Sequence, residues 1–173
     1  TGELTRILAA RNRNKDVQFI AIDREDGMEE EARVKCKDFA NVKVIKSDLI
    51  EIEFEKADFI VSNYTMQFTK PKNRQILFDR IYSALNWGGG FLLFEKVRAS
   101  DARFQDMMTA IYTDYKIEQG YNADKIVSKA RSLKGVLEPF STQGNLDLLK
   151  RSGFVDIMTV MKYVCFEGFL AIK

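Results

Sequence analysis

The sequence predicts an α/β fold built on a mainly parallel sheet, and three observations lead to it. Short apolar runs of strand length alternate with amphipathic helical segments through the first hundred residues. The connections between these segments are short. Several apolar runs are followed at once by small or polar residues, as at the carboxyl ends of strands in an open sheet, where ligands bind.

Each element of the first half has its own local signal. Leu4, Ile7 and Leu8 lie at helical spacing and predict a helix over residues 3–12. Apolar runs predict strands at 17–22, 42–45, 57–61 and 91–94. Residues 26–38 are acidic first and basic later, which suits a helix dipole. Pro71 opens a helix to about residue 86, and the glycines after Trp87 predict a turn at 87–90.

The second half has a different pattern. Residues 101–116 and 123–137 are expected to be helices with no strand between them, and Pro139 follows the second. We interpret residues 100–140 as a helical cover over the ligand site. A helix at 142–152 and two final strands at 155–164 and 166–172 complete the chain, which we expect to be a single domain over 1–173.

The amino-acid composition excludes several classes of catalytic and metal site. The chain has 173 residues, a net charge of +2 and no histidine, which excludes histidine-containing triads and histidine-ligated metals. No metal site is therefore expected. Its two cysteines, Cys36 and Cys165, are far apart and favour a reducing compartment, so we expect a cytoplasmic protein without a membrane span.

Three expected strands end in a polar side chain: Asp23, Asp48 and Asn63. In a parallel sheet they would point into one crevice. An aspartate after the second strand of a nucleotide-binding sheet usually accepts the ribose hydroxyls. Asp48 could accept from an adenine amino group while Leu49 covers the ring, and Asn63 could hold the polar tail. Any one of them alone is more often a helix cap or a solvated turn.

These residues resemble a class I S-adenosylmethionine-dependent methyltransferase. Further strings extend the resemblance from Gly2 to Lys173, and with them the chain is similar to the carboxy-S-adenosylmethionine synthase family. They are Ser62-Asn63-Tyr64-Thr65-Met66-Gln67-Phe68, Arg80-Ile81-Tyr82-Ser83-Ala84-Leu85-Asn86, Glu95-Lys96, Tyr115-Lys116, Gly120-Tyr121, Lys129, Leu133, Gly153-Phe154 and Cys165-Phe166.

The resemblance implies a Rossmann-like sheet with helices on both faces and an antiparallel final strand. It implies that S-adenosylmethionine and prephenate give carboxy-S-adenosylmethionine and phenylpyruvate in a homodimer. That product serves the modification of wobble uridine in tRNA. By position, Asp23 would hold the ribose, Asp48 and Leu49 the adenine, and Asn63 the methionine part, while Gly2 closes the glycine-rich turn.

The sequence departs from the family in several places. Arg24 follows the ribose aspartate where the family has asparagine or a similar residue, and we include it at the cofactor edge. The family arginine that recognises the carboxylate aligns with Ala130, so Arg131 and Tyr121 are the candidates here. The family's N-terminal helix and first strand are also missing, and we expect the natural chain to be longer.

Two other functions stay open from the sequence. The first is an ordinary methyltransferase acting on tRNA or a small acid. The second is a dimerisation module that has lost its ligand. The cluster of Phe104, Met107 and Met108 is interpreted as core or as a dimer contact.

Overall fold

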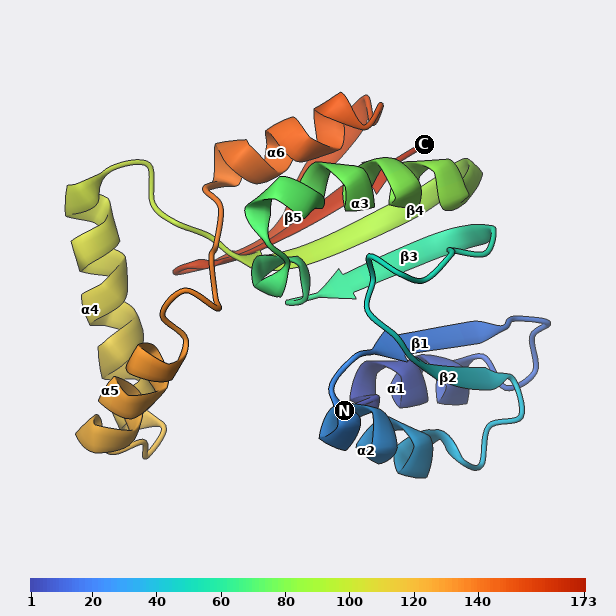
Figure 1. Cartoon of the computed structure of the whole chain (residues 1–173), viewed down its shortest axis with the longest axis horizontal. Helices are drawn as coiled ribbons and strands as arrows, with labels where there is room; N and C mark the ends of the chain where they lie inside the picture. The colour runs from blue at the N-terminus through green and yellow to red at the C-terminus, as the bar shows by residue number, and fades with distance from the viewer. The chain divides into compact units, whose positions relative to one another are not determined.

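The computed structural model describes all residues from Thr1 to Lys173 (Figure 1). They form two compact units, residues 1–53 and residues 54–173. Each unit has a sheet of its own, two-stranded in the first and four-stranded in the second. The single domain expected over 1–173 stays a prediction.

The first unit is a small α/β layer. Its elements are α1 (Glu3–Arg11), β1 (Phe19–Asp23), α2 (Asp26–Cys36) and β2 (Val42–Lys46). The strands run parallel, with Phe19 opposite Val42 and Asp23 opposite Lys46. Both helices contact β1, and Ala9, Ala32 and Cys36 form the buried apolar positions. The parallel register places the ends of β1 and β2 at one edge.

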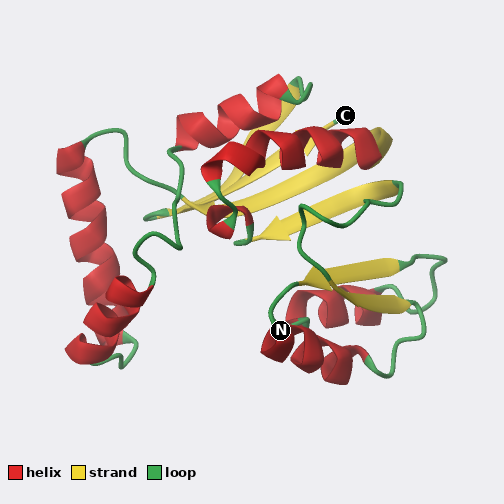
Figure 2. Cartoon of the chain, viewed as in Figure 1, coloured by secondary structure: helices red, strands yellow, loops and turns green.

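The second unit carries a mixed sheet, four α-helices and one 3-10 turn (Figure 2). Its elements are β3 (Ala57–Asn63), a 3-10 turn η1 (Met66–Phe68), α3 (Pro71–Ala84), β4 (Leu85–Lys96), α4 (Ala102–Glu118), α5 (Ala123–Ser132), α6 (Thr142–Arg151), β5 (Asp156–Tyr163) and β6 (Phe166–Ile172). The strand order is β3-β4-β6-β5. Strand β3 is parallel to β4, whereas β6 is antiparallel to both β4 and β5, which confirms the expected antiparallel final strand.

Of the five helical segments in this unit, four are α-helices, and η1 is a single 3-10 turn of three residues. Helices α3 and α6 lie side by side against the sheet (Figure 1). Side chains join them: Gln75 Nε2 donates to Ser152 Oγ at 2.9 Å, and Ser152 Oγ donates to Asp79 Oδ1 at 2.8 Å. Beneath them Phe91 contacts Phe78 edge-on and Phe154 in a stacked arrangement, so the core of the unit lies between this helix layer and β4.

The turn predicted at 87–90 is wrong as a separate element, because these residues lie inside β4. Ala57 pairs with Leu85 but Phe59 pairs with Gly90, so β4 carries extra residues that bulge from the ladder. Gly88 has φ 76°, a left-handed conformation that favours glycine. The glycines therefore permit a bulge within one long strand.

The helices expected after residue 100 are present as α4 and α5, and no strand separates them. The Asp101 side chain accepts from the Phe104 amide and Asn122 accepts from the Lys125 amide, which caps the two N-termini. The second helix ends at Ser132 rather than near residue 137. Neither helix buries a residue, and their role as a cover stays a prediction. No helix in the chain is long and apolar enough to span a membrane.

Candidate functional site

Asp23 occupies the last position of β1, at the edge where β1 and β2 both end. Its carboxylate Oδ1 accepts from the Glu25 amide at 3.1 Å, which turns the chain into α2. The second carboxylate oxygen has no partner within the protein. Asp23 is half-buried, and only one of its carboxylate oxygens accepts a hydrogen bond. The other oxygen is available to accept from a ligand hydroxyl.

Asp48 lies just beyond β2 at the same edge. Its Oδ1 accepts from the Ile50 amide at 3.0 Å, and its Oδ2 lies 3.6 Å from Arg24 Nη1. Arg24 also donates through Nε to Glu25 at 3.0 Å, and its side chain is half exposed. Arg24 thus pairs with Glu25 at the start of α2 and with Asp48 beyond β2. Leu49 follows Asp48 and is half-buried, as a residue covering a ring would be.

Gly2 is the N-cap of α1 and has φ 70°. A Cβ at this position would lie 2.7 Å from Ala32 Cα, so a side chain would collide with the backbone of α2. Its carbonyl accepts from the Arg6 amide at 2.9 Å and begins the helix. Glycine is required here by both conformation and space. Gly2, Asp23, Arg24, Asp48 and Leu49 all belong to the first unit.

Asn63 ends β3 in the second unit, opposite Phe94 of β4. It is exposed, and its side-chain amide has no partner within the protein, so both its donor and its acceptor are available. The next residue, Tyr64, has φ 57°, and its amide donates to the Phe94 carbonyl at 2.9 Å. The convergence of Asn63 with Asp23 and Asp48 stays a prediction, because they belong to different units.

A buried polar cluster behind Asn63 was not foreseen from the sequence. Arg74 is 1% exposed and donates to the carbonyls of Thr69 and Glu138, at 2.9 and 2.6 Å. Gln67 is also buried, and its Oε1 accepts from the Lys96 amide at 3.0 Å. Burial raises the pKa of Glu95 to about 8, although Arg74 opposes the shift. The cluster fixes the chain around η1, directly after the Asn63 strand end.

Arg131 and Tyr121, the candidates for a substrate carboxylate, are both exposed. Arg131 lies in the last turn of α5, and Tyr121 precedes that helix, where its amide donates to the Lys116 carbonyl at 3.0 Å. The structure leaves both side chains accessible. Their role toward a carboxylate stays a prediction.

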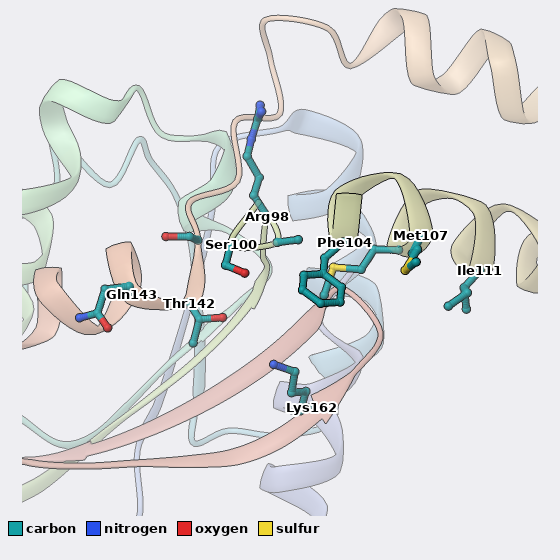
Figure 3. Close-up of a pocket in the computed structure, with 11 residues that line it drawn as sticks. Arg98, Ser100, Phe104, Met107, Ile111, Thr142, Gln143 and Lys162 are labelled. Carbon is teal, nitrogen blue, oxygen red and sulfur yellow. The ribbon is translucent and has the colours of Figure 1, made fainter. Parts of the chain in front are cut away.

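A hollow of about 740 Å³ lies in the second unit and contains none of the predicted site residues. Figure 3 shows Phe104, Met107 and Ile111 from α4 lining it, with Lys162 of β5 and Arg98 nearby. The Lys162 ammonium is already paired with Glu167 at 2.7 Å. Its lining mixes apolar side chains of α4 with polar ones and contains no histidine or carboxylate. Phe104 and Met107 are half exposed and so lie outside the core of this chain, while the alternative of a dimer contact stays a prediction.

Taken unit by unit, the polar strand ends offer hydrogen-bonding groups that suit parts of a nucleoside or an amino acid. Carboxylates with a free acceptor suit ribose hydroxyls and an adenine amino group, and a free amide suits an amino acid tail. The chain has no group of three or more cysteine, aspartate or glutamate side chains that could hold a metal ion.

Comparisons with known proteins identify the family of the chain. A family model described as a methyltransferase domain matches residues 1–89. The carboxy-S-adenosyl-L-methionine synthase of Campylobacter lari is 39% identical over 168 residues, covering 96% of this chain and 72% of the relative. The synthase of Nautilia profundicola is 36% identical, covering 100% of this chain and 74% of the relative.

Solved structures are similar in fold at low sequence identity. The pyocyanin biosynthetic protein PhzM matches with a TM-score of 0.67 at 16% identity, over 99% of this chain and 47% of PhzM. The S-adenosylmethionine-dependent methyltransferase SibL matches with a TM-score of 0.65 at 13% identity, over 99% of this chain and 47% of SibL. The chain thus spans about half of each solved structure and shares its α/β, Rossmann-like fold. The chain belongs to the carboxy-S-adenosyl-L-methionine synthase family of S-adenosylmethionine-dependent enzymes.

Proposed function

We propose that the protein converts S-adenosylmethionine and prephenate to carboxy-S-adenosylmethionine and phenylpyruvate. The observation that carries this proposal is its identity of 39% to a synthase of that name over almost the whole chain. The strand-end residues support it, since Asp23, Asp48 and Asn63 offer the acceptors and donors that an adenosyl amino acid needs.

The chemistry asks little of protein acids and bases. The methyl group beside the sulfonium is acidified, and its loss of a proton gives an ylide carbon. Prephenate loses its ring carboxyl as carbon dioxide and its hydroxyl as hydroxide, which leaves phenylpyruvate. The ylide carbon bonds to carbon dioxide, and the methyl proton and the hydroxide leave as water. A chain without histidine is suited to this reaction, because its main task is to hold two substrates together.

Within this proposal the roles follow the predicted positions. Asp23 holds the ribose, Asp48 and Leu49 hold the adenine, and Asn63 holds the methionine part. Gly2 lets the first turn approach the ligand, and Arg24 lies at the same edge. Arg131 and Tyr121 are proposed to face the carboxylate of the substrate.

Mass spectrometry of the nucleoside product tests the reaction. The full chain is incubated with S-adenosylmethionine, with and without prephenate. We expect a nucleoside heavier by one carboxyl group only when prephenate is present. S-adenosylhomocysteine together with a methylated acceptor would instead identify an ordinary methyltransferase, and the absence of any binding of S-adenosylmethionine in calorimetry would identify a module without a ligand.

We also propose that the protein is a homodimer. Apolar side chains on α4 support this, because Phe104, Met107 and Ile111 are each 50% to 55% exposed and follow one another at helical spacing. Sedimentation of the full chain should give twice the monomer mass of 19.9 kDa. Met107→Glu should shift it toward the monomer, whereas the exposed control Arg103→Glu should leave the mass unchanged.

The cellular setting is likewise a proposal. Both cysteines are free and buried, which suits a reducing cytoplasm. We propose that the product supplies the modification of wobble uridine in tRNA. Loss of the oxyacetyl group from tRNA in cells lacking this protein, and its recovery on re-expression, would support that link.

A further inference from the structure

Two lysines of the second unit converge on one aromatic ring. Lys96 is the last residue of β4, and Lys116 lies on α4. Their Nζ atoms lie 5.1 Å and 4.5 Å from the centroid of the Tyr112 ring. Both side chains are half-buried, and neither ammonium forms an ion pair or hydrogen bond within the protein. Two cations therefore lie against one aromatic ring without an internal anion.

The groups nearest to this pair do not neutralise it. Burial raises the pKa of the Cys165 thiol, with Lys96 and Lys116 opposing the shift, so the thiol keeps its proton near neutral pH. Burial also raises the pKa of Tyr112. Burial lowers the pKa of Lys116, and repulsion from Lys96 lowers it further. Like charges held together in a partly buried place are most favourable when an anion binds between them.

Aromatic rings form the wall beside the lysines. Phe166 lies opposite Lys96 in the β4–β6 ladder, and its ring contacts Tyr112 edge-on at 5.2 Å. The same ring contacts Tyr64 edge-on at 5.6 Å. Since Tyr64 directly follows Asn63, these contacts connect the lysine pair to the strand end proposed to hold the methionine part. A ring-bearing acid could pack on this wall while its carboxylate meets the ammonium groups.

We propose that Lys96 and Lys116 form an anion subsite that binds a carboxylate of the second substrate, a cyclic dicarboxylic acid. This inference rests on the proposed function and names the residues that recognise the acid.

Steady-state kinetics of three variants tests the subsite: Lys96→Gln, Lys116→Gln and the double variant. Each removes a charge and retains a side chain of similar length. We expect the KM for prephenate to rise about tenfold in each single variant and more in the double variant, as for the loss of a charged hydrogen bond. The Kd for S-adenosylmethionine should stay within about twofold. Lys116→Arg should restore most of the affinity, and the exposed control Lys125→Gln should behave as wild type.

Equilibrium binding separates failure of the subsite from failure of the proposed function. Calorimetry with prephenate and with carboxy-S-adenosylmethionine needs no turnover. If wild type makes no carboxylated product, the proposed reaction is wrong, yet weaker prephenate binding by the double variant still supports the subsite. If a folded double variant binds prephenate as tightly as wild type, the proposed subsite is wrong. The same holds if the double variant binds only carboxy-S-adenosylmethionine more weakly and prephenate unchanged. If Lys96→Gln does not fold, Lys116→Gln gives the same comparison on a helix that buries no residue.

Discussion

The Ser47 amide donates to the Asp23 carbonyl at 3.1 Å and joins the ends of β1 and β2. This hydrogen bond continues the parallel ladder beyond its last pair, Asp23 and Lys46. It keeps Asp23 and the following Asp48 at one edge of the first unit. The backbone therefore fixes the spacing of the two carboxylates proposed to bind the nucleoside.

Asp23→Asn should weaken binding of S-adenosylmethionine about 10- to 100-fold, because a neutral amide replaces the charged acceptor proposed to hold the ribose hydroxyls. Asparagine can still accept from the Glu25 amide, so the turn into α2 should survive. Titration calorimetry measures the effect, with the exposed Asp16→Asn as the matched control. An unchanged Kd in the folded variant would remove Asp23 from the site.

Asn63→Ala should weaken binding of the same ligand about 5- to 20-fold, through loss of neutral hydrogen bonds. The exposed Asn14→Ala serves as its control. A double variant with Asp23→Asn tests whether both units contact one ligand. If the fold-losses in affinity of the two single variants multiply in the double variant, both residues contact one ligand. If only Asp23→Asn weakens binding, Asn63 lies outside the site.

Glu95 should make stability fall as pH rises. Burial raises its pKa from the ordinary 4.5 to about 8, so between these values the native state holds a proton that the unfolded state has released. The stabilisation from the protonated Glu95 carboxyl is fully present below the unfolded-state pKa of 4.5. It is lost as the pH rises through the native-state pKa of about 8. We expect the free energy of unfolding to fall by up to about 1.4 kcal/mol per pH unit in this window.

Urea unfolding of wild type and Glu95→Gln at several pH values checks this expectation. The variant keeps a neutral side chain at every pH, so its stability should depend less on pH than that of wild type. Glu30→Gln, on the exposed face of α2, is the control and should leave the slope unchanged. Parallel curves for wild type and Glu95→Gln would show that Glu95 titrates normally.

Arg74→Met should destabilise the protein by about 3 kcal/mol. It leaves the carbonyls of Thr69 and Glu138 without their buried donor. It also removes the guanidinium that lies 4.2 Å from the centroid of the Phe140 ring. Thermal or urea unfolding measures the change against Arg103→Met, an exposed substitution on α4. A change below about 1 kcal/mol would mean that other groups satisfy these carbonyls.

Local sequence signals predicted most elements of the fold. Apolar runs of strand length located the strands, and Pro71 marked the first residue of α3. The predicted turn at 87–90 was wrong because glycine permits a bulge as readily as a turn, and only the pairing of β3 with β4 distinguishes the two. The division into two units also depends on contacts between segments, which periodicity does not report.

The sequence predicted that polar residues stand at strand ends, and Asp23 and Asn63 are the last residues of β1 and β3. The Lys96–Lys116 pair depends on how α4 meets the end of β4, a tertiary arrangement without a local pattern. The burial of Arg74 and Glu95 could not be predicted from the sequence either. Charged residues are usually exposed, and no local pattern around these two indicates otherwise. Such residues become recognisable once the packing around them is known.

Helices α4 and α5 bury none of their residues, and α4 meets the sheet through a few rings such as Tyr112 against Phe166. Local opening of this segment therefore breaks far fewer contacts than unfolding of the sheet does. Its amide protons should exchange with solvent long before those of β4. A substrate could then enter and a product leave by transient detachment of the segment, while the strands with the proposed binding residues keep their register.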